Sequence, residues 1–205
     1  MRTVPLPRIG TAAAWRDAAR GLLTAQVPPE AVLWSYDDPA QADLFGAAAP
    51  APPPDPGIRV PKAFIDLANT AVWHSDADRF ARLYAFLWRL RDHPGLMTDR
   101  GDPALAHLRG LEKNVRRCAH KMKAFVRFRD LASDGPRRRF AAWFEPTHHT
   151  VEPAASFFAR RFADMDWMIV TPDVTAQFEN GTLEFREGRP KPDLPEDATE
   201  ELWGT

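Results

Sequence analysis

The sequence has a single cysteine, Cys118, among 205 residues. One cysteine excludes an internal disulfide, and it excludes a zinc or iron–sulfur site that needs several thiolates of this chain. We therefore expect a reducing compartment, the cytoplasm. Cys118 itself is expected to be a small core residue on the apolar side of its helix.

Long apolar runs are also absent. The chain starts MRTVPLPRIG, and no run approaches the ~20 apolar residues that a membrane span needs. These features exclude a secretory signal and a membrane helix, so we expect no membrane partner. The sequence contains no glycine-rich phosphate loop, no HExxH metal signature and no nucleophile elbow. It therefore predicts no metal, no cofactor and no convincing catalytic site.

The chain has little net charge, because it contains 27 Lys and Arg residues and 28 Asp and Glu residues. The distribution is nevertheless uneven. Acidic residues dominate the end of the chain, as in DLPEDATEEL, whereas basic residues concentrate between Lys113 and Arg161. Such a cluster is typical of a nucleic-acid-binding surface. For any single arginine, a solvated helix face whose aliphatic stems cover the core is the plainer interpretation.

Twenty prolines divide the chain. We predict one α/β domain over residues 1–187, with a Pro/Ala-rich linker or loop at 37–57 and an acidic, Pro-rich tail at 188–205. The last residues, ATEELWGT, look like the start of a helix. We therefore expect the chain to be a fragment of a longer polypeptide.

The predicted fold is mixed α/β (α+β), although the sequence does not predict strand order. An amino-terminal strand–helix–strand unit has Thr11 as a helix N-cap and a buried strand at 31–36. Central helices are expected at 61–71, from an N-cap at Ser75, and from Asp102–Pro103 to Phe125 with Gly110 as a candidate break. Strands near 126–129, 140–144 and 167–170 and a helix at 153–162 follow. Asn180-Gly181 predicts an antiparallel hairpin with a type I′ turn.

The helix ending at Phe125 carries its apolar residues Val115, Ala119 and Met122 on one narrow face and basic residues on the opposite face. Cations of this density can neutralise phosphates and release counterions. The candidate phosphate contacts are Arg116, Arg117, His120, Lys123, Arg127, Arg129, Arg137, Arg138, Arg139, Arg160 and Arg161. Aromatic side chains near Phe128 and Trp143 are candidates for stacking on bases.

Two further segments are weaker candidates. Glu145, His148 and His149, in FEPTHH, have side chains suited to acid–base chemistry, but their spacing matches no metal signature. Adjacent histidines on a strand also point to opposite faces, so an ordinary loop remains the alternative.

The pentapeptide QADLF, with Gln41, Leu44 and Phe45, resembles the bacterial sliding-clamp-binding motif. An extended segment can dock its two apolar side chains in pockets of a partner. The simpler alternative is that Leu44 and Phe45 fold back on the core of this chain.

The segments RRCAHKMKAFVRFRDL, RRRFAAWFEPTHH, FFARRFADMDWMIVTPD and EELWGT resemble the bacterial family labelled "probable DNA metabolism protein". Members of that family occur alone or fused ahead of an X-type uracil-DNA glycosylase domain, and they are associated with a radical-SAM protein. The resemblance implies a role in DNA repair or modification, but it carries over no catalytic residue.

Three hypotheses follow. The first is a DNA-binding accessory module, cytoplasmic and associated with the nucleoid, that positions a uracil-DNA glycosylase domain in cis or a radical-SAM partner. The second is a nucleic-acid-processing enzyme that uses Glu145, His148 and His149. The third is an adaptor between proteins, docking the sliding clamp or the radical-SAM partner. The sequence does not indicate the DNA structure recognised or the oligomeric state.

Overall fold

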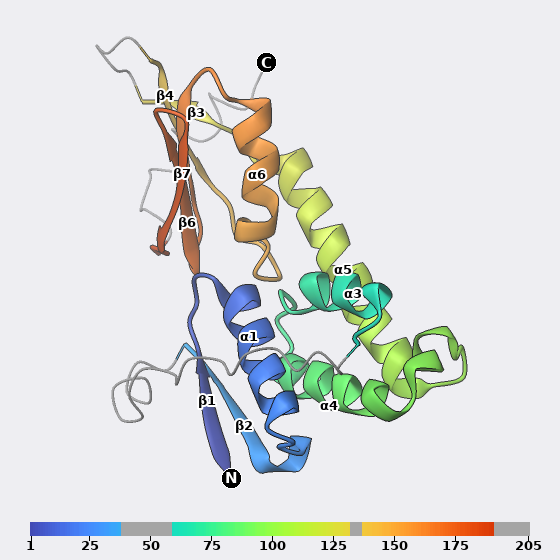
Figure 1. Ribbon diagram of the computed structural model, residues 1–205. Helices are drawn as coiled ribbons and strands as arrows, with labels where there is room; N and C mark the ends of the chain where they lie inside the picture. The colour runs from blue at the N-terminus through green and yellow to red at the C-terminus, as the bar shows by residue number, and fades with distance from the viewer. Residues whose placement is uncertain (38–58, 132–136, 191–205) are drawn as a thin grey trace.

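The computed structural model describes residues 1–37, 59–131 and 137–190. Their helices and strands form a mixed α/β fold with two sheets (Figure 1). The amino-terminal unit consists of β1 (Arg2–Leu6), α1 (Thr11–Thr24), a short 3-10 helix (Pro29–Ala31) and β2 (Val32–Tyr36). The central helices are α3 (Lys62–Ala71), α4 (Arg79–Asp92) and α5 (Pro103–Phe125), with a 3-10 helix at Pro94–Thr98. The last third contains β3 (Arg129–Asp130), β4 (Arg139–Trp143), α6 (Val151–Arg161), β5 (Asp166–Val170), β6 (Val174–Glu179) and β7 (Thr182–Glu187).

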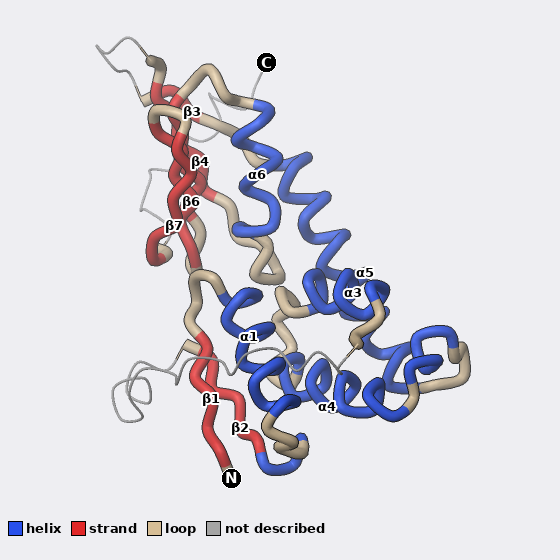
Figure 2. Tube along the Cα trace, in the orientation of Figure 1, coloured by secondary structure: helices blue, strands red, loops and turns tan. Residues whose placement is uncertain are grey.

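The smaller sheet pairs β1 with β2 in parallel. The larger sheet has the order β3-β4-β5-β6-β7, in which β4 and β5 are parallel and the other neighbours are antiparallel. Helix α6 connects the two parallel strands, as a crossover connection requires. Figure 2 shows α6 along one side of this larger sheet. The β1–β2 pair lies beyond the amino-terminal end of α6.

Helix α5 links two hydrophobic cores. Its amino-terminal part packs Leu105, Leu108 and Val115 into a core with α1, α3, α4 and the smaller sheet. Its carboxyl-terminal part places Met122 in a second core, between α6 and the larger sheet. With 23 residues, the helix is about 34 Å long at 1.5 Å per residue.

Several sequence predictions are confirmed. The strand–helix–strand unit and the carboxyl-terminal hairpin are present. Asn180 and Gly181 have φ of 50° and 82°, the left-handed values that a type I′ turn needs. The Asp102 side chain accepts a hydrogen bond from the Leu105 amide at 2.8 Å, and it therefore caps α5 as expected.

Other predictions are wrong. Gly10, with φ of 76°, is the N-cap of α1, and the Thr11 hydroxyl instead donates to the carbonyls of Pro7 and Arg8. Asp78 precedes α4, because the Ser75 hydroxyl is engaged by a distant histidine. Helix α5 continues through Gly110.

Two strand predictions also need correction. The strand at 126–129 is reduced to β3, because Val126 is the residue that ends α5. The strand predicted as buried at 31–36 is only partly buried: Val32 is its one buried residue, Leu33 is 45% exposed, and Trp34 and Tyr36 are partly buried against the core. It belongs to a two-stranded sheet, where one neighbouring strand covers less of the backbone and side chains.

Candidate functional site

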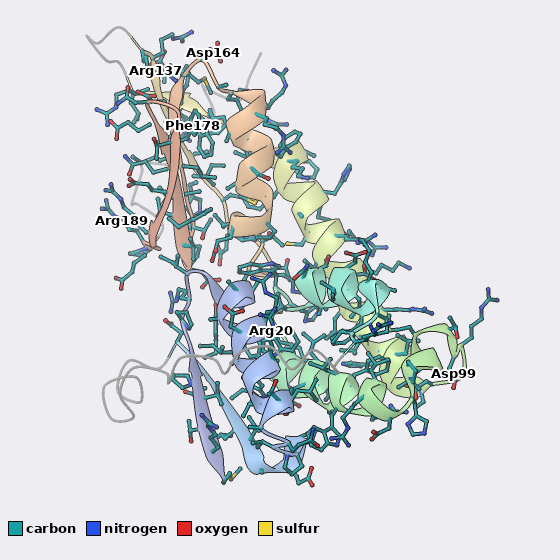
Figure 3. All side chains as sticks on the ribbon, in the orientation of Figure 1. Arg20, Asp99, Arg137, Asp164, Phe178 and Arg189 are labelled. Carbon is teal, nitrogen blue, oxygen red and sulfur yellow. The ribbon has the colours of Figure 1, made fainter. Side chains whose placement is uncertain are left out.

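The predicted basic residues gather at one end of the molecule, which we call the basic end. It consists of the carboxyl-terminal halves of α5 and α6 and the adjoining strands β3 and β4 (Figure 1). Figure 3 places Arg137 and Asp164 at this end, far from β1 and β2. Most of its cations are exposed, namely Arg116, Arg117, His120, Lys123, Arg127, Arg138, Arg139, Arg160 and Arg161, and Arg129 is partly buried.

The cations of the basic end differ in how they are paired. Arg116 lies 2.6 Å from the Glu112 carboxylate, and Arg138 lies 2.5 Å from that of Asp130. Apart from Arg137, the other candidate cations have no acidic side chain within ion-pair distance in the described part of the chain, and Arg117, Lys123 and Arg160 are among them. Arg139 also forms no ion pair there, but its charge helps to lower the pKa of Asp166.

Arg137 has a structural role at the same end. Its Nε donates to the largely buried carboxylate of Asp166 at 2.8 Å, and the Asn180 amide donates to the same carboxylate. Burial alone would raise the pKa of Asp166, but the hydrogen bonds from Asn180 and Arg137 outweigh it and lower the pKa. Arg137 thus ties the start of β4 to β5 and the hairpin turn.

The aromatic candidates are placed differently from one another. The Phe128 ring packs edge-on against Phe158 and Phe162 in the second core, so it is not free to stack on a base. Trp143 ends β4 at the opposite end from Arg139. Phe125, in the last turn of α5, is 62% exposed and lies among the cations.

The three candidate acid–base residues do not form one site. Glu145 is exposed. The buried His148 ring lies 4.0 Å from that of His74, and its Nδ1 is 2.9 Å from the Ser75 hydroxyl. The His149 Nδ1 instead lies 2.8 Å from the Asp173 carboxylate. The adjacent histidines therefore have separate partners, although both lie in the bend after β4 and not on a strand. Burial, with the neighbouring histidines, lowers the pKa of His148 to about 4.

His149 belongs to a second polar site, which we call the junction, between the two sheets. Both parallel strand pairs, one in each sheet, point their carboxyl ends at it: β1 and β2 end at Leu6 and Tyr36, and β4 and β5 end at Trp143 and Val170. The residues that follow these strands supply polar side chains. These are Arg8 after β1, Asp37 after β2, His149 after β4 and Asp173 after β5.

The side chains of the junction contact one another closely. Arg8 pairs with the Asp37 carboxylate and donates to the Asp173 carbonyl. The His149 ring lies 5.3 Å from that of Tyr36. Burial is the main cause that lowers the pKa of His149 and raises that of Tyr36.

Helix N-termini also meet at the junction. The Glu152 carboxylate, in the first turn of α6, accepts hydrogen bonds from the Gly10 amide, the N-cap of α1, at 3.1 Å. Burial raises the pKa of Glu152. Arg79, the first residue of α4, stacks its guanidinium 4.5 Å from the centroid of the Tyr36 ring.

Sequence reasoning missed most of the junction. Arg8, Tyr36, Arg79 and Asp173 belong to no motif and are separated by dozens of residues. The one usable signal was that polar residues follow predicted strands, because ligands in α/β sheets bind outside the carboxyl ends of the strands.

Other sites are less informative. A pocket of about 150 Å³ lies between α1, α3 and α4 and is lined mostly by apolar side chains such as Trp15, Phe64 and Leu87. In the same residues, no group of three or more His, Cys, Asp or Glu side chains is arranged to hold a metal ion. None of the described helices is long and apolar enough to cross a membrane.

Two remaining predictions concern individual segments. Cys118 is buried, as expected of a core residue, and its sulfur lies 3.5 Å from the Thr150 hydroxyl. The clamp-motif residues Gln41, Leu44 and Phe45 lie outside the described residues.

Comparison with known proteins gives one family. Neither the curated proteins nor the solved structures include a match to the chain. The family DUF4130 matches residues 77–205, which is more than half of the chain and includes α4, α5, α6 and the larger sheet. The chain therefore belongs to DUF4130, a family described as a domain of unknown function.

Proposed function

We propose that the chain is a DNA-binding accessory module in DNA repair or modification, and that its basic end contacts the phosphates. The observation that carries the proposal is the convergence of exposed cations from separate segments, α5, α6 and the β3–β4 edge, at one end of the molecule. Residues distant in the sequence thereby contribute positive charge to the same end of the molecule.

The unpaired cations support this proposal more than the paired ones do. Arg117, Lys123 and Arg160 form no ion pair in the described chain, so a phosphate would meet no internal competitor at these three residues. Part of this charge also offsets the negative ends of α5 and α6, where Lys123, Arg160 and Arg161 occupy the last turns. That local role does not require Arg117 or Arg139.

The exposed ring of Phe125 supports contact with bases. A phenylalanine that is 62% exposed leaves apolar surface in water, and the neighbouring cations keep a phosphate chain within reach. Stacking of one base on an aromatic ring contributes about 1–3 kcal/mol. We therefore transfer the expected base contact from Phe128 to Phe125.

The resemblance to the "probable DNA metabolism protein" family supports the biological setting. In this proposal the module holds DNA for a partner enzyme, either an X-type uracil-DNA glycosylase domain in cis or a radical-SAM protein. The sliding-clamp motif belongs to the adaptor alternative, and its test is deletion of residues 41–45 followed by measurement of clamp binding.

Fluorescence anisotropy with single-stranded and duplex DNA over a salt series tests the proposal. We expect the logarithm of affinity to fall linearly with the logarithm of salt, by about 0.9 per phosphate contact on duplex DNA. Arg117→Glu and Arg160→Glu, each made singly, should weaken binding and flatten this slope. The matched control is Arg20→Glu, the same charge reversal at an exposed residue of α1 (Figure 3). Equal weakening by Arg20→Glu, or no binding at low salt, would contradict the proposal.

A further inference from the structure

We propose that the DNA bound by this protein is single-stranded, and that it follows one row of side chains on α5 and stacks a base on Phe125. The row, which we call the α5 ridge, consists of four exposed residues spaced four apart, Lys113, Arg117, Lys121 and Phe125. This inference rests on the proposed DNA-binding function. It adds the form of the DNA and the path that the strand takes.

Helix geometry places the members of the α5 ridge next to one another. Residues four apart lie on neighbouring turns of the same face, about 6 Å apart along the axis at 1.5 Å per residue. This step is close to the distance between successive phosphates of an extended strand, so three cations can follow three phosphates of one strand. The ridge leads into the basic end, where the second half of α5 runs beside α6 (Figure 1).

The cations of the α5 ridge are not neutralised within the protein. Lys113, Arg117 and Lys121 have no acidic side chain within ion-pair distance in the described residues. The adjacent row of α5 differs, because Arg116 lies 2.6 Å from the Glu112 carboxylate. Available positive charge is therefore concentrated on a single row, which suits contact with a single phosphate chain.

The helix dipole does not account for this row. Cations stabilise the carboxyl end of a helix only within its last turn. Lys113 and Arg117 lie at least eight residues before Phe125, the last residue of α5, which is about two turns or more. Their charge is thus available to a ligand and is not required by the helix end.

Phe125 at the end of the row is the feature that selects the form of DNA. It is 62% exposed, and it is the one exposed phenylalanine, tyrosine or tryptophan among the described residues. The next cation is held close to it, because the Arg127 guanidinium donates to the carbonyls of Ala124 and Val126 on either side of Phe125. An apolar ring is therefore presented to solvent between cations.

An exposed ring of this kind favours unpaired bases. In a duplex, both faces of an internal base are covered by its neighbours, so contact with Phe125 would first require unstacking, which costs free energy. A base of a single strand offers its face without that cost. A row of cations combined with an aromatic ring is the arrangement that proteins use to bind single strands without reading their sequence.

The test compares two fluorescein-labelled DNA molecules, an oligodeoxythymidylate and a hairpin duplex with the same number of phosphates. Anisotropy is measured with the full chain over a salt series. We expect the single strand to bind about tenfold more tightly than the duplex. Phe125→Ala should weaken single-strand binding about tenfold, as expected for the loss of one stacked base, and should leave its salt slope unchanged. Phe125→Trp should restore the affinity.

A strand of abasic sites separates stacking from charge. It retains the phosphates but has no bases, so wild type and Phe125→Ala should bind it equally. Lys113→Gln and Lys121→Gln should each flatten the salt slope for the single strand by about 0.7. Arg116→Gln should flatten it less, because its charge is already paired with Glu112. The general control is Arg20→Gln, on the exposed side of α1, which should have no effect.

Two results would overturn the inference and leave the proposed function intact. One is salt-dependent binding in which the duplex binds as tightly as the single strand and Phe125→Ala changes neither affinity. The other is an unchanged salt slope in both Lys113→Gln and Lys121→Gln while Arg160→Glu still weakens binding. The absence of binding to either DNA at low salt would overturn the inference and the proposed function together.

Discussion

At the scale of single residues, His148 is held in a neutral state by its surroundings. Its Nδ1 accepts from the Ser75 amide and lies against the Ser75 hydroxyl, while the His74 ring packs against it. Burial, reinforced by the neighbouring histidines, lowers the pKa of His148 to about 4. An unfolded histidine has a pKa of about 6.5. The unfolded chain therefore binds more protons at this residue between those two values.

Stability should consequently fall as the pH is lowered from about 6.5 to 4. The contribution of His148 is fully present above about pH 6.5 and is lost towards pH 4, with a slope of at most about 1.4 kcal/mol per pH unit for one proton. His148→Gln should flatten the pH dependence of the free energy of unfolding, measured with urea. The control is His93→Gln, at an exposed histidine, and a wild-type slope in His148→Gln would refute the argument.

At the scale of elements, neither the backbone conformation nor the packing of α5 requires glycine at residue 110. A Cβ placed at Gly110 would meet no atom within 4 Å outside the neighbouring helix backbone, and the residue is exposed within a continuous helix. Gly110→Ala should raise the free energy of unfolding by about 0.5–1 kcal/mol, because it restricts the unfolded backbone and favours the helix.

Gly181→Ala provides the opposite control. Gly181 has φ of 82° in the hairpin turn, so alanine there is strained and should destabilise the protein. Urea unfolding measures both variants. Destabilisation by Gly110→Ala would mean that α5 bends or breaks at this residue in solution.

At the scale of the whole molecule, α5 couples the two cores. Leu111 and Val115 belong to the first core and Met122 to the second, with exposed Lys121 between them. Lys121→Pro removes a helical hydrogen bond and should cost about 3 kcal/mol or more. We expect hydrogen exchange in α6 and the larger sheet to accelerate more than exchange in α1 and α4. Lys121→Ala should leave both regions protected, and equal acceleration of both in Lys121→Pro would contradict separable cores.

The two ends of α6 and β4 also differ in the groups that they bring together. Strand carboxyl ends and helix N-termini meet at the junction, whereas helix carboxyl ends meet at the basic end. In agreement with the helix dipoles, the Glu152 carboxylate lies at the N-termini of α1 and α6, whereas Lys123 and Arg160 lie in the last turns of α5 and α6. The same chain direction that positions His149 also positions Arg139 and Arg160 far from it.

The sequence by itself determined the features that depend on near neighbours along the chain. The Asp102 cap, the apolar face of α5 through Val115 and Met122, and the Asn180-Gly181 turn follow from contacts within a few residues. Ser75 was misassigned as a cap because its hydroxyl lies against His148, far away in the sequence. Thr11 was misassigned because its hydroxyl donates backwards to the carbonyls of Pro7 and Arg8 and does not cap α1.

Only the tertiary structure decided which distant residues meet. The burial of Phe128, the parallel pairing of β4 with β5, and the junction of Arg8 with His149 each join segments whose separation carries no local signal. Side-chain periodicity reports which face of an element is apolar, but not which other element covers it. The basic residues were recognisable as a group in the sequence, whereas their division into paired Arg137 and unpaired Arg117 required the packed structure.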